Sequence, residues 1–177
     1  TSLLDRKPAN MITHNYPSGQ VPARPASFAG RIIALARAAF AVLDSAQPLA
    51  ALLARFYVGQ VFFLSGLTKL RDWGTTVALF TDEYKVPFLS APVAAALGTA
   101  GEIVLPVLLV LGLDGRFSSL GLFVVNAVAV ISLAEIAPAA LQQHILWGVL
   151  LAGLAIFGCG RWALDSVLAP RLDRALV

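Results

Sequence analysis

Charged residues are scarce in this sequence. They make up 13% of its 177 residues, whereas hydrophobic residues make up 58%, and the mean hydropathy is +0.79. An ordinary soluble domain carries about 25% charged residues, so this chain has too little charge to coat a water-exposed globule. The composition argues against a cytosolic enzyme, a disordered regulator and a nucleic-acid-binding protein, and it predicts an integral membrane protein.

Cysteine and histidine are almost absent too. The single cysteine, Cys159, excludes an intramolecular disulfide, a CxxC redox pair and a multi-cysteine zinc site. There are two histidines, His14 near the beginning of the chain and His144 far from it. We therefore expect no metal site and no haem held by a pair of histidines.

What the sequence does contain is long apolar runs. Four stretches approach or exceed the roughly 20 helical residues that cross about 30 Å of hydrocarbon, and they cover residues 49–70, 92–112, 117–134 and 143–163. Backbone groups in lipid must be satisfied within the segment, so spans this apolar are helices. In the longest connection, 71–91, the run 75–80 predicts a short helix or a re-entrant turn. The predicted fold is an all-α, four-transmembrane-helix bundle preceded by an amphipathic interfacial helix.

The segments outside the spans are more polar. Residues 1–25 hold four prolines and predict an extended cytoplasmic arm, in which Met11 is a candidate second translation start. Residues 26–47 have one apolar helical stripe and predict a helix lying in the membrane interface. The alternative, a fifth span, would bury Arg31 and Arg37 at roughly 2.5–3.5 kcal/mol each. We expect Pro48 to end this helix, residues 49–168 to form the membrane domain, and residues 169–177 to form a cytoplasmic tail.

Basic residues near the span ends predict the orientation. Seven lie on the side of the two termini and three on the other side. Since basic loops stay in the cytoplasm, both termini are expected to be cytoplasmic.

Two cations share one face of the first span. Arg55 and Lys69 lie on a single helical stripe together with Gly59, Phe62 and Gly66. Their separation of 14 positions corresponds to about 21 Å along a helix. The two cations are therefore expected in opposite leaflets, where they cannot share a compact site.

Glu102 and His144 are the other candidates for chemistry. Glu102 lies deep in the second span, where a charged side chain is costly unless it is paired or functional. One expectation is a structural ion pair with Arg55 or Lys69. The alternative is a role in handling protons or contacting a quinone. His144 is expected near the outer mouth of the last span, in a polar cluster with Lys69, Glu135 and Glu102. A simple hydrogen-bonding role is its alternative. Asn126, midway along the third span, is expected to bond to a neighbouring helix.

These residues, in this order, resemble the DoxX family within the broader DoxX/DoxD/MauE-like group. The resemblance covers about residues 49–168 and rests on Arg55 with Gly59, Gly66 with Lys69 and Leu70, Glu102 with Pro106 and Gly112, His144, and the run Gly158 to Asp165. It implies a small four-helix protein of the bacterial inner membrane. Some members are associated with quinone-coupled thiosulfate oxidation, others with redox or oxidative-stress assemblies or catechol handling. MauE-like relatives support disulfide formation, for which this chain lacks paired cysteines.

Two functions follow as hypotheses. The first is an accessory subunit of a larger membrane redox or respiratory complex. The second is a quinone-reactive membrane oxidoreductase in which Glu102 carries protons and Lys69 and His144 contact the quinone carbonyls. The sequence encodes no recognisable redox cofactor site, so a quinone is the only cofactor considered, and it leaves open whether the protein is an enzyme. A transporter is disfavoured because four short spans leave little room for repeats or broken helices.

Overall fold

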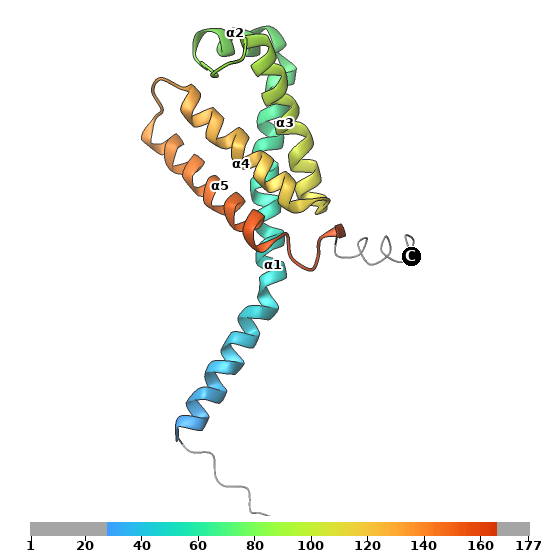
Figure 1. Ribbon diagram of the computed structural model, residues 1–177, viewed down its shortest axis with the longest axis vertical. Helices are drawn as coiled ribbons and strands as arrows, with labels where there is room; N and C mark the ends of the chain where they lie inside the picture. The colour runs from blue at the N-terminus through green and yellow to red at the C-terminus, as the bar shows by residue number, and fades with distance from the viewer. Residues whose placement is uncertain (1–27, 166–177) are drawn as a thin grey trace, which may run out of the picture. The chain divides into compact units, whose positions relative to one another are not determined.

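The computed structural model describes residues 28–165, and every regular element among them is a helix (Figure 1). The elements are α1 (Phe28–Arg71), α2 (Trp73–Asp82), α3 (Ala91–Leu111), α4 (Gly115–Ser132) and α5 (Pro138–Phe157). Four of them, all but α2, are long and apolar enough to cross a membrane. The predicted all-α, four-span fold is confirmed. The predicted arm 1–25 and tail 169–177 lie outside the described residues.

The chain divides into two compact units, Thr1–Ala39 and Phe40–Val177. The described part of the first unit is the beginning of α1, and its residues are exposed apart from the half-buried Gly30. The second unit contains the end of α1 and all the other helices. The candidate functional site described below lies in this second unit.

Pro48 does not end a helix, so the prediction of a break there is wrong. It lies inside α1 and is buried. A proline removes one backbone donor, but membrane helices tolerate prolines in their interior.

The boundaries of the last span were also misplaced. α5 begins at Pro138 and ends at Phe157, whereas the hydropathy pattern predicted 143–163. Gly158, with φ 84°, leaves the helical region and stops the helix there. His144 consequently lies in the second turn of α5. The short helix expected over 75–80 is confirmed as α2, which begins at Trp73 and is capped by the carboxylate of Asp72.

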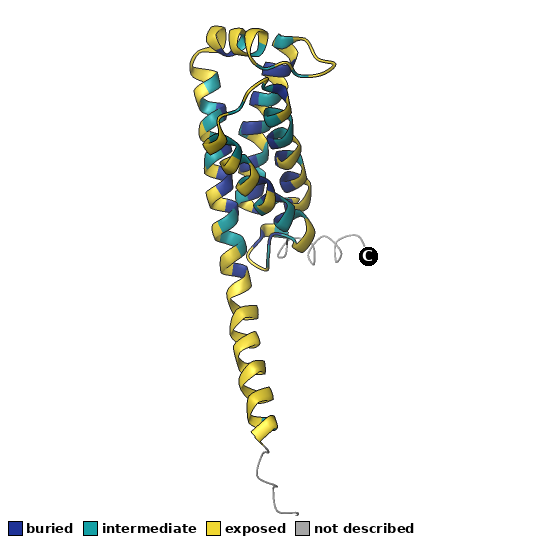
Figure 2. Ribbon diagram, turned by 90° about the vertical axis from the view of Figure 1, so that its left-hand side faces the viewer, coloured by how far each residue is buried: buried dark blue, intermediate teal, exposed yellow. Residues whose placement is uncertain are grey.

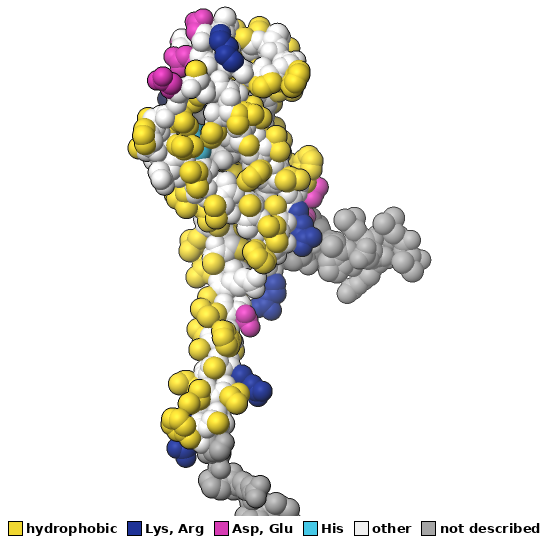
Figure 3. All heavy atoms as spheres, turned by 60° about the vertical axis from the view of Figure 1, so that its left-hand side comes forward, with side chains coloured by type: hydrophobic (Ala, Val, Ile, Leu, Met, Phe, Trp, Pro, Cys, Tyr) yellow, Lys and Arg dark blue, Asp and Glu magenta, His cyan; other side chains and the backbone are white. Residues whose placement is uncertain are grey.

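Polar and apolar residues are placed as expected for a protein dissolved in lipid. Arg55, Glu102 and Asn126 are buried in the bundle, whereas many leucines, valines and isoleucines face outward (Figure 2). Figure 3 shows apolar side chains across the middle of the bundle and charged side chains near α2 and at the opposite end. This distribution suits four helices whose solvent is hydrocarbon, with polar groups turned towards one another.

Glycines bring α1 against α3. A Cβ added at Gly59 would lie 2.6 Å from Val110 Cγ2, and one at Gly66 would lie 2.8 Å from Ile103 Cδ1 and 3.1 Å from Glu102 Cβ. Small residues at an interface let membrane helices approach closely. This approach sets Glu102 beside the last two turns of α1.

The bundle is closed at the end opposite α2 by residues 158–165. The N–H of Asp165 donates to the carbonyl of Gly112 at 3.1 Å. The N–H of Gly115, the first residue of α4, donates in turn to the Asp165 carboxylate at 3.1 Å. One residue therefore ties the chain after α5 to the α3–α4 turn.

Candidate functional site: a cavity beneath α2

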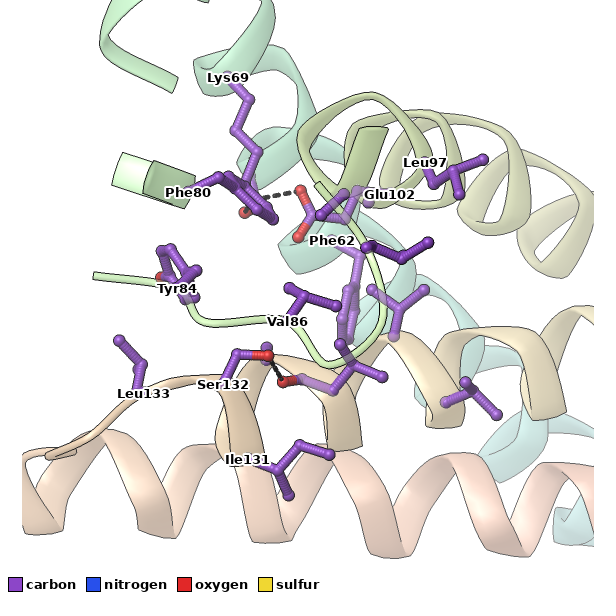
Figure 4. Close-up of a pocket in the computed structure, with 18 of the residues that line it drawn as sticks. Phe62, Lys69, Phe80, Tyr84, Val86, Leu97, Glu102, Ile131, Ser132 and Leu133 are labelled. Atoms are coloured by element: carbon purple, nitrogen blue, oxygen red, sulfur yellow. Dashed lines mark hydrogen bonds and ion pairs between the residues drawn. The ribbon is translucent and has the colours of Figure 1, made fainter. Parts of the chain in front are cut away.

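A cavity of about 640 Å³ lies at the α2 end of the bundle. Its walls come from α1, α2, the segment 84–89, α3, α4 and α5, and Figure 4 shows part of the lining. Most of the lining side chains are apolar. The polar ones are Ser65, Lys69, Tyr84, Glu102, Ser132, His144 and, through an indole N–H that has no hydrogen-bond partner within residues 28–165, Trp147. Pockets for small organic ligands have about this volume and this mixture of an apolar lining with a few polar groups.

Some residues that line the cavity also lie at the surface of the bundle. Leu97 of α3 and Val124 and Ile131 of α4 line it and are also exposed on the surface of the bundle. The two helices meet at the Leu111–Gly115 turn and diverge towards α2 (Figure 1). The lining of the cavity is therefore continuous with the apolar surface of α3 and α4.

An ion pair stands in the wall of the cavity. Lys69 Nζ lies 2.5 Å from Glu102 Oε2, and the side chains are 20% and 10% exposed (Figure 4). The ammonium group also donates to Ser65 Oγ, one turn earlier in α1, at 3.0 Å. A lysine has three N–H donors, so one of them is left for a ligand. The carboxylate likewise has a second oxygen.

The ion pair expected between Arg55 and Glu102 is not formed. Glu102 pairs with Lys69, and Arg55 donates through Nη2 to the carbonyl of Trp162 at 3.4 Å. Arg55 is fully buried, and its Nη1 is close enough to Gly112 that a Cβ added there would lie 2.5 Å away. Glu102 projects from the α1-facing side of α3 at the height of Gly66, one turn from Lys69, which puts Arg55 out of its reach. Arg55 therefore belongs to the end of the bundle opposite the cavity.

His144 is held by Asn126 across the α4–α5 interface. Asn126 Nδ2 donates to the carbonyl oxygen of His144 at 2.9 Å, and Asn126 Oδ1 lies 2.8 Å from His144 Nδ1. The imidazole also meets the ring of Trp147 edge-on, with centroids 5.0 Å apart. The interhelical bond expected of Asn126 is confirmed. Glu135, placed by the sequence in the same polar cluster, is exposed and is not among the residues lining the cavity.

Tyr84 is a polar wall residue that the sequence did not single out. It follows α2 and is held by an isolated antiparallel bridge to Leu133, next to which the N–H of Lys85 donates to the carbonyl of Ser132 at 2.9 Å. Phe80, one turn earlier, packs on its ring with centroids 5.1 Å apart. The sequence gave no signal for this placement, because it depends on where the loop after α2 returns across the end of α4.

The phenol of Tyr84 is expected to ionise above the ordinary tyrosine pKa of 10.0, chiefly because it is buried and then because the carboxylates of Glu102 and Glu83 oppose a phenolate. A difference titration at 295 nm between the parent and Tyr84→Phe measures this pKa. Glu83→Gln should lower it, since one opposing charge is removed. Because the folded-state pKa is the higher one, the contribution of Tyr84 to stability is complete below pH 10 and is lost as the pH rises through the folded value. An ordinary pKa in the parent would show that Tyr84 is open to water.

Comparison with known proteins identifies the central part of the chain. A model of the DoxX family matches residues 50–135. Lys69, Glu102 and Asn126 lie inside this match, whereas His144 lies beyond it. Neither a curated protein nor a solved structure matches the chain.

Proposed function

Because the chain carries a DoxX domain over residues 50–135, as the resemblance predicted, we propose that it serves a membrane redox or respiratory complex as an accessory subunit that binds a quinone-class molecule. The observation that carries the proposal is the Lys69–Glu102 ion pair in the wall of an otherwise apolar cavity. A quinone ring needs such a combination, since it is flat and apolar and has polar oxygens at its two ends.

The exposed apolar residues at the edge of the cavity suit a lipid-soluble ligand. A membrane quinone carries a long hydrocarbon tail, which must stay in the bilayer while the ring is bound. We propose that the tail leaves the cavity past Leu97 and Val124, which line it and are also exposed on the surface of the bundle. A polar, water-soluble metabolite would gain nothing from contact with these apolar side chains.

The accessory role is supported by the scarcity of electron-carrying side chains. The whole sequence has one cysteine and two histidines, and residues 28–165 contain no group of three side chains that could hold a metal ion. We therefore assign the electron donor to a partner protein in the same membrane. The chain would supply the place where the quinone is held.

A second candidate is a quinone-reactive oxidoreductase, and the place of the Glu102 carboxylate in the cavity wall beside Lys69 favours it. Reduction of a quinone consumes two electrons and two protons. Glu102 would pass protons to the ring oxygens and Lys69 would stabilise the carboxylate left behind. The electrons would come from a partner or from a small reductant such as thiosulfate, sulfite or a catechol.

We also propose a placement in the membrane. The end of the bundle with Arg116 and Arg161 would face the cytoplasm of a bacterial inner membrane, because basic residues collect on that side, and both termini would lie there too. The beginning of α1 would lie along the lipid headgroups, because Phe28, Ile32 and Leu35 are exposed on a helix that also carries Arg31 and Arg37.

Calorimetric titration of the full chain in lipid nanodiscs with a short-tailed benzoquinone tests the binding proposal. We expect saturable binding to the parent and at least a tenfold loss in Glu102→Gln and Lys69→Met, because each variant removes one partner of the pair and leaves the other unsatisfied. Quinol formation with each candidate reductant, followed by absorbance, separates the two candidate functions. Turnover in the purified protein that is lost in Glu102→Gln would favour the enzyme.

Glu135→Gln is the matched control. It removes an exposed carboxylate outside the cavity and should bind the quinone as the parent does. Equal binding by the parent, Glu102→Gln and Lys69→Met would refute the site. Absence of any binding would refute the quinone.

A further inference from the structure

The direction of the hydrogen bonds between Asn126 and His144 is set by chemistry. A carbonyl oxygen can only accept, so the Asn126 atom that faces the carbonyl of His144 must be the amide nitrogen. The other end of the same amide, Oδ1, then faces Nδ1 of the imidazole at 2.8 Å. An amide oxygen can only accept as well, and therefore Nδ1 must carry the proton.

This assignment leaves the other ring nitrogen without a proton. A neutral imidazole has one N–H and one bare nitrogen, so with the proton on Nδ1 the nitrogen Nε2 is bare and accepts hydrogen bonds. His144 lines the cavity, and Trp147 covers the ring from the side. A ligand that reaches His144 therefore meets a hydrogen-bond acceptor, and a quinone carbonyl, which is also an acceptor, gains nothing from it.

We infer that the cavity recognises its ligand through a hydroxyl group that donates to His144 Nε2, so that a dihydroxy-aromatic ring, the quinol form, is bound in preference to the quinone. This inference rests on the proposed function and replaces the expectation that His144 contacts a quinone carbonyl. Lys69 and Glu102 meet the other polar end of the ring, where the ammonium donates and the free carboxylate oxygen accepts. Asn126 is a positioning residue, because it selects the tautomer without touching the ligand.

The tautomer can be measured without any ligand. The chain has two histidines, so His14→Gln with a histidine-free affinity tag leaves His144 as the sole source of histidine signals. Nitrogen-15 spectra of the labelled protein in nanodiscs distinguish a protonated ring nitrogen from a bare one. We expect the proton on Nδ1, and we expect Asn126→Leu to give a mixture of both tautomers. A proton on Nε2 in the parent would overturn the inference.

The ligand preference is measured by calorimetry under anaerobic conditions, with a short-tailed benzoquinol and the matching benzoquinone. We expect the quinol to bind about tenfold or more tightly, since one buried hydrogen bond separates the two forms. Asn126→Leu should abolish the difference. Asn126→Asp should reverse it, because a carboxylate beside Nδ1 favours the imidazolium, whose Nε2–H donates to a carbonyl.

The outcomes separate this inference from the proposed function. If quinone binds as well as quinol, and both bindings are lost in Glu102→Gln, the site stands and the role given to His144 is wrong. If neither form binds, the proposed function fails and this inference fails with it. Reversal of the preference in Asn126→Asp would be hard to reconcile with a merely structural Asn126, since loss of packing alone weakens both ligands together.

Discussion

Lys69→Met is expected to lower the free energy of unfolding by about 3–5 kcal/mol, the usual cost of leaving one member of a buried ion pair alone. Glu102 is 10% exposed, and a lone carboxylate at this depth cannot reach bulk water. Titration with a denaturing detergent, monitored by circular dichroism, measures the difference.

The double variant Lys69→Met/Glu102→Leu tests whether the loss of stability comes from the unpaired charge. With both charges gone no group is left unsatisfied, so most of the lost stability should return. Lys85→Met is the control for removing a lysine: Lys85 is exposed and bonds to the carbonyl of Thr81, and its loss should stay within about 0.5 kcal/mol. Equal effects of Lys69→Met and Lys85→Met would show that the ion pair does not stabilise the bundle.

The helices and their buried faces could be read from the sequence. Hydrophobic runs have no other stable arrangement in lipid than a helix, and the spacing of Arg55, Gly59, Phe62 and Gly66 placed them on one stripe, which is buried in the structure. Periodicity fixes positions within one helix because the rise and turn per residue are constant. For the same reason the separation of Arg55 and Lys69 into different regions could be foreseen.

The partners across helices could not be read in this way. Whether Glu102 meets Arg55 or Lys69 depends on how far α3 slides along α1, and that register is set by the fit of Gly59 against Val110 and of Gly66 against Ile103. Neither contact leaves a mark on hydropathy. The pairing of Asn126 with His144 likewise depends on the register of α4 against α5. It decides which hydrogen bonds His144 can make, and the residue types alone do not.

The helix boundaries predicted at Pro48 and around Gly158 were both wrong, for opposite reasons. Pro48 was expected to break a helix and does not, because one missing donor is a small loss in a helix of 44 residues. Gly158 lay inside a predicted span and ends it, because the apolar residues on both sides concealed the change of backbone conformation. Hydropathy records how a segment is solvated and carries no information about φ.

Gly112→Ala is expected to destabilise the protein by about 2–5 kcal/mol. Gly112 ends α3 with φ 70°, a left-handed conformation that costs other residues about 1–2 kcal/mol. The added Cβ would also lie 2.5 Å from Arg55 Nη1 and 2.7 Å from Ala163 Cα. The arginine can move, but the backbone at Ala163 is held by the bond between Asp165 and Gly112, so overpacking adds about 1–3 kcal/mol.

Gly153→Ala is the matched control for this prediction, because Gly153 lies within α5 and a Cβ there meets no atom within 4 Å. Alanine in place of a mid-helix glycine should stabilise by about 0.5–1 kcal/mol. Detergent-induced unfolding of the two variants should therefore shift in opposite directions. Gly112 lies at the end of the bundle opposite the cavity, so the folded fraction of Gly112→Ala should bind the benzoquinol with the affinity of the parent. A loss of affinity equal to that of Glu102→Gln would mean that the two ends of the bundle are coupled, and the description of the cavity as an independent site would then be wrong.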